Sequence, residues 1–226
     1  MWNKIQRIYV GTDLVRPSWK PWANTIAYYK FNWNLNDSSG NNRNLSMYTW
    51  SFTYPTLSSW QQYCRLRSSA YTTNYTIPFN RTAYTISWWY SWNTISTQYQ
   101  KIIVDLRSGD NYRPRAFNFG SWWNYVYWAA SFDGYGVAYT HNTWYNVVTT
   151  YNNMVVSSYI NWTFIHSLTY SRSETTGTLR INCATDKTST SYSCAWWLSE
   201  LILESKARTA QEIAKYYKDT KWNYGL

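Results

Sequence analysis

Glycine is scarce in this chain, and histidine, cysteine and acidic residues are few. The 226 residues include 8 Gly, 2 His, 3 Cys and 11 Asp or Glu, whereas a chain of this length ordinarily holds roughly 16 Gly. His141 and His166 have no Glu or Cys at metal-ligand spacing, which argues against a zinc site. The sequence also lacks a Gly-x-Ser-x-Gly nucleophile motif and a glycine-rich phosphate loop. Common signatures of hydrolases and nucleotide-binding proteins are therefore missing.

Long apolar stretches are missing as well. No segment approaches the roughly 18 apolar residues of a membrane-spanning helix, and the N-terminus lacks the apolar core of a secretory signal. We therefore expect no membrane span and no cleavable signal peptide.

The three cysteines leave at least one without a disulfide partner in the chain. Cys183 and Cys194 flank the loop 184–193 between two predicted strands, so they could face each other and form a disulfide. Two ordinary buried thiols are the alternative, because spacing alone does not give the geometry that a disulfide needs. Cys64 has no neighbouring cysteine in the sequence.

Aromatic residues and positive charge are abundant. Aromatic residues make up 21% of the chain, with 24 Tyr and 17 Trp, and 45% of residues are hydrophobic, which is enough to bury the core of one large domain. The net charge of +10 could attract nucleic acid, anionic lipid or acidic polysaccharide. However, Lys and Arg are spread along the chain, and groups such as Arg113-Pro114-Arg115 are short. We expect a cationic, solvated surface and no nucleic-acid partner.

Short apolar and aromatic runs alternate with turn-forming clusters from Thr25 onward. In the run 83–92 ("AYTISWWYSW") Thr85 and Ser87 share one face, which predicts a half-buried strand whose inward residues are Tyr84, Ile86, Trp88 and Tyr90. Further strands are predicted at 100–106, 123–131, 143–151, 154–161, 163–169, 178–182 and 197–204. This spacing predicts an all-β fold, a two-sheet antiparallel jelly-roll sandwich.

The two ends of the chain differ from this pattern. Pro17 and Pro21 forbid continuous regular structure near the N-terminus, so we interpret residues 1–23 as a leader or attachment segment before a domain spanning 24–226. Near the C-terminus, Thr209 and Glu212 have the spacing of a capping box. They predict one short helix over 210–218, whose apolar stripe, with Ile213 and a Tyr, docks onto the sandwich.

Four segments in order carry a family resemblance: "AYYKFNWNLNDSSGNNRNLS" (27–46), "AYTISWWYSW" (83–92), "TWYNVVTTYNNMVVSSYINWTF" (143–164) and "LSELILESKARTAQEIAKYY" (198–217). Together they resemble the laminin-G-like, concanavalin A-like jelly-roll family, in which one strand ends in a Phe-x-Gly-x-x-x-Asp-x-Ser-Gly turn and a Thr-Trp strand leads to a Tyr-x-Asn-Gly hairpin. The resemblance spans roughly 25–220 and implies a lectin-like binding module. The first 23 residues, with "RIYVGTDLVRP", are similar to the leader of some phage virion proteins.

The same resemblance places tryptophan where the family has glycine. Trp33 falls on the Gly of the first turn and Trp162 on the hairpin Gly, while Trp92 and either Trp196 or Trp197 also stand where Gly would be natural. One hypothesis is that UGA codons meaning glycine were translated as tryptophan. The alternative is an aromatic-rich protein that tolerates Trp in looser turns.

The pair Asn161-Trp162 makes this question specific. It joins two predicted strands where a tight type I′ turn needs positive φ at both central positions, and Asn-Gly is the usual pair. We expect a hairpin here, between 155–160 and 163–169, with Trp162 exposed at its tip. Trp88 and Trp144, on strand faces, are interpreted as genuine tryptophans.

Residues capable of catalysis do not form a convincing set. Glu200 and Glu204 share a strand face, but four strand residues span about 13 Å, against about 5–5.5 Å in retaining and 6.5–9.5 Å in inverting glycosidases. We interpret both as structural carboxylates and expect no enzymatic activity. His166 alternates with Phe164 and Leu168, so a half-buried packing role is expected for it.

A ligand site is predicted in the stretch 121–136 ("SWWNYVYWAASFDGYG"), near a predicted hairpin. Aromatic faces stack on sugar rings, and a carboxylate accepts hydrogen bonds from sugar hydroxyls. The candidate ligand-binding residues are Trp122, Trp123, Asp133 and Tyr135. The alternative is that these tryptophans pack in the core or stand in place of glycine.

Asp37, in "NDSSGNN", is the one candidate metal ligand. Its carboxylate could join a calcium site together with Asn oxygens, but capping of its own turn is the favoured interpretation. No other cofactor is expected.

The leading functional hypothesis is a non-catalytic binding module that recognises carbohydrate or another surface ligand. It would be displayed on a virion or a cell surface and act in adhesion. The alternative is a structural or decoration protein of a phage virion, held to virion proteins through residues 1–23. A glycoside hydrolase ranks third, because the carboxylate pair is missing.

Overall fold

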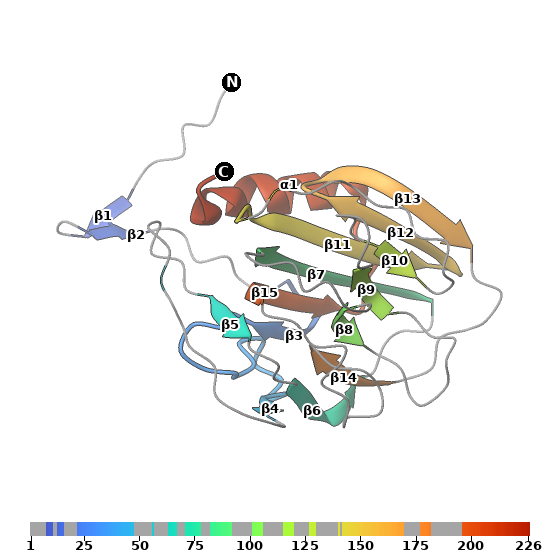
Figure 1. Ribbon diagram of the computed structural model, residues 1–226, viewed down its shortest axis with the longest axis horizontal. Coiled ribbons are helices and arrows are strands. Elements are labelled where there is room, and N and C mark those ends of the chain that lie inside the picture. The colour runs from blue at the N-terminus through green and yellow to red at the C-terminus, as the bar shows by residue number, and fades with distance from the viewer. Residues whose placement is uncertain are drawn as a thin grey trace.

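Two antiparallel β-sheets form the body of the molecule, as the strand pattern predicts (Figure 1). The computed structural model describes residues 8–10, 13–15, 22–47, 56, 63–66, 71–77, 82–91, 101–105, 115–119, 127–129, 140, 142–169, 177–181 and 196–226. The statements below concern these residues.

The seven-stranded sheet has the order β13 (Thr163–Thr169), β12 (Val155–Ile160), β11 (Tyr145–Asn152), β7 (Ala83–Ser91), β15 (Trp196–Glu204) and β3 (Thr25–Tyr29), with β5 (Cys64–Leu66) also paired to β15. The six-stranded sheet has the order β10 (Tyr127–Ala129), β9 (Arg115–Phe119), β8 (Lys101–Asp105), β14 (Gly177–Ile181), β6 (Tyr71–Ile77) and β4 (Leu45–Met47). Every strand pair is antiparallel. The chain passes between the sheets several times, so the prediction of an all-β, two-sheet sandwich is confirmed.

Two short strands precede the sandwich. β1 (Ile8–Val10) and β2 (Asp13–Val15) pair with each other as a separate two-stranded sheet. The division of the chain into a leader, 1–23, and a domain, 24–226, remains a prediction.

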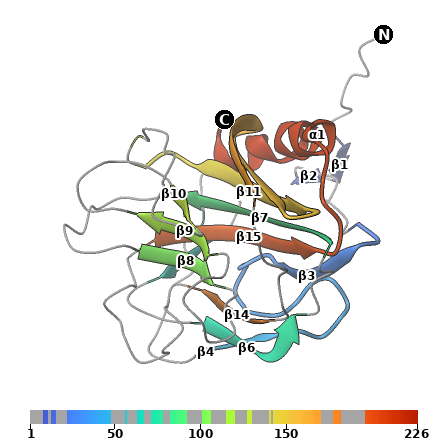
Figure 2. The ribbon, with the colours of Figure 1, turned by 90° about the vertical axis from the view of Figure 1, so that its right-hand side faces the viewer.

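The strand β7 is buried on both faces. Its predicted inward residues are at most 1% exposed, and Tyr84 stacks on Tyr151 of β11 with ring centroids 5.0 Å apart. The prediction that β7 is only half-buried was wrong, because Thr85, Ser87 and Trp89 on its other face are also fully buried. Figure 2 shows the reason: α1 (Ala210–Thr220) lies on one side of the seven-stranded sheet, while β14 and β6 lie on the other.

The C-terminal helix begins as predicted and runs slightly further. The Thr209 hydroxyl accepts a hydrogen bond from the Glu212 amide at 3.2 Å, and the Glu212 carboxylate accepts one from the Thr209 amide at 2.8 Å, which completes the capping box. The 3₁₀ helix η2 (Lys221–Tyr224) follows. Buried Ile213 and Tyr216 dock α1 onto the sheet.

A cluster of aromatic side chains fills the layer between the helices and the sheet. Trp89 of β7 stacks on Tyr224 at 4.0 Å and on Tyr217 at 5.7 Å between ring centroids. Trp144, which precedes β11, lies 5.0 Å from Tyr224. Trp88 and Trp144 are both buried, whereas their interpretation as genuine tryptophans remains a prediction.

The turn at Asn161 and Trp162 has the predicted geometry. It joins β12 to β13, with φ of 49° at Asn161 and 67° at Trp162, and Trp162 is 49% exposed. The Asn161 side chain accepts a hydrogen bond from the Asn146 amide at 2.9 Å, and the Asn161 amide donates to the Asn146 carbonyl at 2.8 Å. These bonds fix the tip of the hairpin to β11.

Candidate functional site

The two carboxylates of β15 lie beneath the helix layer. The pairing of β15 with β7 shifts between Ser199 and Leu201, and Glu200 has a φ of 49° at this irregularity. The Glu200 carboxylate is buried and accepts a hydrogen bond from the Tyr216 hydroxyl of α1 at 3.1 Å. Burial raises the pKa of Glu200, although the Tyr216 hydrogen bond and the charge of Lys30 act in the opposite direction. A carboxyl in this position secures the helix to the sheet.

Glu204 forms a buried ion pair at the end of the same strand. Its Oε2 lies 2.5 Å from Nε of Arg208, and both side chains are almost wholly buried. Burial raises the pKa of Glu204, and the positive charge of Arg208 opposes that shift. Since both carboxylates are committed to contacts within the fold, their interpretation as structural residues is supported, and they do not form an accessible catalytic pair.

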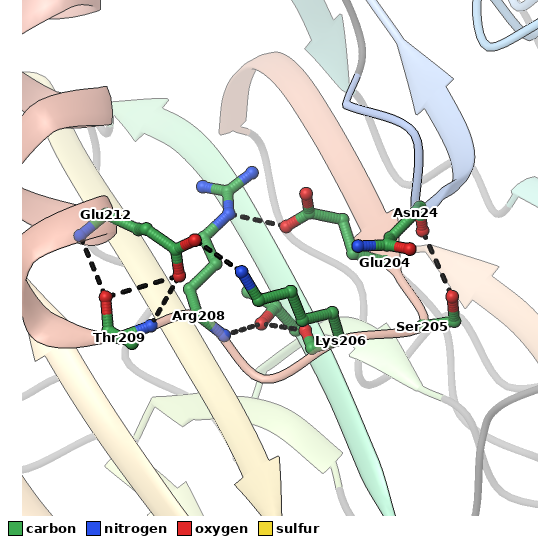
Figure 3. A network of polar contacts seen from close by, with 8 residues as sticks. Asn24, Glu204, Ser205, Lys206, Arg208, Thr209 and Glu212 are labelled. Carbon is green, nitrogen blue, oxygen red and sulfur yellow. Dashed lines mark hydrogen bonds and ion pairs between the residues drawn. The ribbon is translucent and has the colours of Figure 1, made fainter.

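Arg208 is the centre of a corner where four parts of the chain meet (Figure 3). Its guanidinium lies 4.0 Å from the ring centroid of Trp22 and 4.7 Å from that of Tyr216. Its amide donates to the Thr85 hydroxyl at 2.9 Å, and this hydroxyl donates to the Lys206 carbonyl at 2.7 Å. The corner therefore ties residue 22 to β7, to the end of β15 and to the start of α1.

Neighbouring contacts reinforce this corner. Ser205 donates from its amide to the Asn24 carbonyl at 3.0 Å and from its hydroxyl at 3.3 Å, while the Lys206 ammonium pairs with Glu212 of the capping box. The segment that enters β3 is thus held against the segment that leaves β15.

The Asp37 carboxylate holds the turn in which it lies, and a calcium role for it remains untested. The carboxylate accepts four protein hydrogen bonds: from the amides of Tyr28, Ser39 and Arg43 at 2.9, 2.8 and 3.1 Å, and from the Ser39 hydroxyl at 2.8 Å. The favoured interpretation, an Asx turn, is therefore confirmed. Within the described ranges, no group of three or more His, Cys, Asp or Glu side chains could hold a metal ion.

Several predicted residues lie outside the described part of the chain: Trp122, Trp123, Asp133, Tyr135, His141, Cys183, Cys194 and Trp92. The ligand site that the sequence predicts at 121–136 and the Cys183–Cys194 disulfide therefore remain predictions. No helix among the residues described above is long and apolar enough to cross a membrane.

The outer face of the β12–β13 hairpin carries an exposed aromatic pair. Tyr159 and Phe164 are cross-strand neighbours, with ring centroids 5.6 Å apart in an edge-to-face arrangement. Phe164 is 53% exposed and Tyr159 is partly exposed. We call these two residues the aromatic pair. An exposed ring on a rigid hairpin can stack on the apolar face of a ligand, such as a sugar ring.

Sequence reasoning missed this pair because of a β-bulge. The pairing of β12 with β13 shifts between Ser158 and Tyr159, so Ser158 lies opposite His166 while Tyr159 lies opposite Phe164. Strict alternation places Phe164 and His166 on one face, but the bulge puts them on opposite faces. His166 and Leu168 are half-buried as expected, whereas Phe164 points to the other side. No sequence signal marks this bulge.

The fold is shared with the binding domains of clostridial toxins. No family model and no curated protein sequence matches the chain. A botulinum neurotoxin type C structure, from a study of cell entry through two ganglioside molecules, superposes with a TM-score of 0.65 at 17% identity over 86% of this chain and 51% of that one. The binding domain of botulinum neurotoxin DC in complex with SialylT gives a TM-score of 0.66 at 16% identity, over 87% of this chain and 51% of that one.

A third structure comes from a different toxin. The binding domain of Paraclostridial Mosquitocidal Protein 1 gives a TM-score of 0.65 at 16% identity over 86% of this chain and 52% of that one. The chain thus spans about half the length of the solved structures that it resembles. At these identities the likeness establishes the fold: an all-β sandwich of the kind found in toxin binding domains.

Proposed function

We propose that this chain is a non-catalytic, carbohydrate-binding module of the laminin-G-like, concanavalin A-like kind. The observation that carries the proposal is the match of 86–87% of the chain to two neurotoxin structures. One belongs to a toxin whose cell entry depends on two ganglioside molecules, and the other is a binding domain solved with SialylT. The order of the sequence motifs supports the family assignment, because the turn at 31–40 and the hairpin at 161–162 follow one another as they do in the laminin-G-like family.

The carboxylates of β15 support the non-catalytic part of the proposal. Glycoside hydrolysis needs one carboxyl to protonate the leaving group and a second to act as nucleophile or base. Glu200 contacts Tyr216 and Glu204 contacts Arg208, both beneath α1. A sugar cannot reach either group while the helix remains docked.

Two surfaces are proposed to bind the ligand. The first is the aromatic pair, whose Phe164 ring is exposed on a hairpin that is fixed at its tip by Asn146 and Asn161. The second is the sequence-predicted set Trp122, Trp123, Asp133 and Tyr135. Single sugar contacts contribute little energy each, so useful adhesion would come from many copies acting together.

Display on a cell or virion surface would supply these copies. We propose that residues 1–23 attach the module to its carrier, which for a phage would be another virion protein. This is supported by the separate β1–β2 sheet and by the contact of Trp22 with Arg208, which joins the end of the leader firmly to the sandwich. A firm junction would transmit the orientation of the leader to the module.

The test is a glycan array probed with multimerised protein, with Phe164→Ala compared against Val155→Ala. Both residues are exposed on the same hairpin, but Val155 lies at its other end, away from Tyr159. We expect binding to a sialylated or other surface glycan that Phe164→Ala weakens about tenfold, the loss of one stacking contact, and that Val155→Ala leaves unchanged.

Equal thermal stability of the two variants would show that the loss is local. If neither the wild-type protein nor its multimer binds any glycan, the carbohydrate proposal is wrong and a purely structural virion role takes its place. If the protein binds but Phe164→Ala has no effect, the site lies elsewhere, and the residues at 121–136 are tested next in the same way.

A further inference from the structure

We propose that the natural residue at positions 33 and 162 is glycine, encoded by UGA codons that the source organism reads as glycine. Trp33 has a φ of 71° and Trp162 a φ of 67°. This left-handed region is the one in which a Cβ is disfavoured and glycine is at home. A bulky aromatic side chain is among the least suited to it.

The surroundings of these two residues strengthen the argument. Trp33 is 67% exposed and Trp162 is 49% exposed, so little burial of their large apolar rings offsets the backbone strain. Trp162 also follows Asn161 in a two-residue hairpin, and Asn-Gly is the pair that such a turn favours most. Both positions therefore have the backbone of glycine and the exposure of a surface turn.

The tryptophans of the core behave in the opposite way. Trp88, Trp89 and Trp144 are buried in the core, and none of them has positive φ. Trp197 lies in β15, partly buried, with its ring 5.2 Å from that of Tyr63, and its φ is not positive either. The structure therefore assigns Trp197 to the genuine tryptophans. These buried or partly buried residues differ from Trp33 and Trp162 both in backbone conformation and in packing.

Positive φ alone does not distinguish a misread glycine codon from an ordinary residue. Met154 has a φ of 71° in the turn between β11 and β12, and Phe31 has a φ of 51°, so this chain does place ordinary residues in the left-handed region. The distinction is compositional: the chain holds 17 Trp but only 8 Gly, against roughly 16 Gly expected. A shortage of glycine matched by an excess of tryptophan is what a codon misreading produces, and no such misreading yields Met or Phe from UGA.

The assignment has a consequence for the binding surface. With glycine at position 162, the hairpin tip carries no ring, and the aromatic pair of Tyr159 and Phe164 is left as the exposed aromatic feature of that hairpin. The proposed function does not depend on Trp162, so the two proposals fail or succeed independently.

The test combines sequencing of the gene with mass spectrometry of the protein from its natural host. We expect UGA at codons 33 and 162 and UGG at codons 88, 144 and 197, and peptide mass spectrometry of the protein from its own host should show Gly at the first two positions and Trp at the other three. UGG at codons 33 and 162, or Trp in the corresponding natural peptides, would overturn the proposal. Gly at position 88 or 144 would also contradict it, because the structure would then fail to distinguish the two groups.

Discussion

The Arg208 guanidinium lies 4.0 Å from the ring centroid of Trp22 and forms an ion pair with Glu204 at 2.5 Å. A buried charge is costly unless it is paired, so each partner depends on the other. Arg208 is therefore the point at which residue 22, β7, the end of β15 and the C-terminal helix are joined. Its removal should affect the whole sandwich.

Arg208→Ala should lower the free energy of unfolding by about 3–5 kcal/mol, because it leaves Glu204 buried without its partner. The control is Lys215→Ala, which removes the exposed pair with Asp219 and should cost at most about 0.5 kcal/mol. Urea unfolding of both variants measures the difference. Replacing both charges, as Glu204→Leu with Arg208→Met, should cost less than Arg208→Ala alone, and a larger loss would show that the ion pair is not the main contribution.

Glu200 makes stability depend on pH. Its pKa is raised in the folded protein, so the folded state holds a proton that the unfolded state has already released above the ordinary pKa of 4.5. The stability that protonated Glu200 contributes is complete below that value and is lost as the pH rises through the folded pKa. Glu200→Gln mimics the protonated carboxyl and should remove this loss.

We therefore expect Glu200→Gln and the wild-type protein to be similarly stable near pH 4, with the variant becoming the more stable of the two as the pH rises. Thermal unfolding across this range gives the comparison. Glu212 provides the opposite case, because hydrogen bonds and Lys206 lower its pKa. The cost of Glu212→Gln should grow as the pH rises towards the ordinary pKa of Glu. Parallel curves for wild type and Glu200→Gln would contradict a raised pKa for the buried Glu200 carboxyl.

Trp33→Gly and Trp162→Gly should each raise the stability of the protein made with tryptophan by about 1 kcal/mol. The left-handed conformation costs a residue with a Cβ roughly 1–2 kcal/mol. Glycine has more conformational freedom in the unfolded chain, which reduces the stability gained by removing this strain. Trp88→Gly, as the core control, should cost more than about 3 kcal/mol. A loss of stability on Trp162→Gly would show that the exposed ring contributes more than the strain removes.

Asp37→Ala should loosen the turn that follows β3. It removes the acceptor of four hydrogen bonds, and we expect a loss of about 2–3 kcal/mol because some of these donors can turn to water. Calcium or a chelator should leave the melting temperature of the wild-type protein unchanged. A rise in melting temperature with calcium would mean that Asp37 is a metal ligand after all.

Local signals in the sequence account for the parts of the fold that could be predicted. The alternation in β7 gave its inward face, and the spacing of Thr209 and Glu212 gave the start of α1, because both depend on neighbours within a few residues. The burial of Trp89 could not be predicted in the same way, since it depends on Tyr217 and Tyr224, more than a hundred residues away.

The candidate site depends even more on contacts that the sequence pattern does not contain. The face on which Phe164 lies is decided by one irregularity in the pairing with β12, and a shift of one residue exchanges the two faces of a strand. The distance argument excluded Glu200 and Glu204 as a catalytic pair, but their contacts with Tyr216 and Arg208 depend on how α1 docks. Sequence periodicity contains neither kind of information.

The proposed function is glycan binding without cleavage. The most direct measurement incubates the multimerised protein with the immobilised glycan that it binds best on the array, and follows retained protein and released reducing ends in the same wells. We expect stable retention, reversed by free glycan, and no reducing ends above the buffer control. Release of reducing ends in proportion to protein concentration would show instead that the module is a glycosidase.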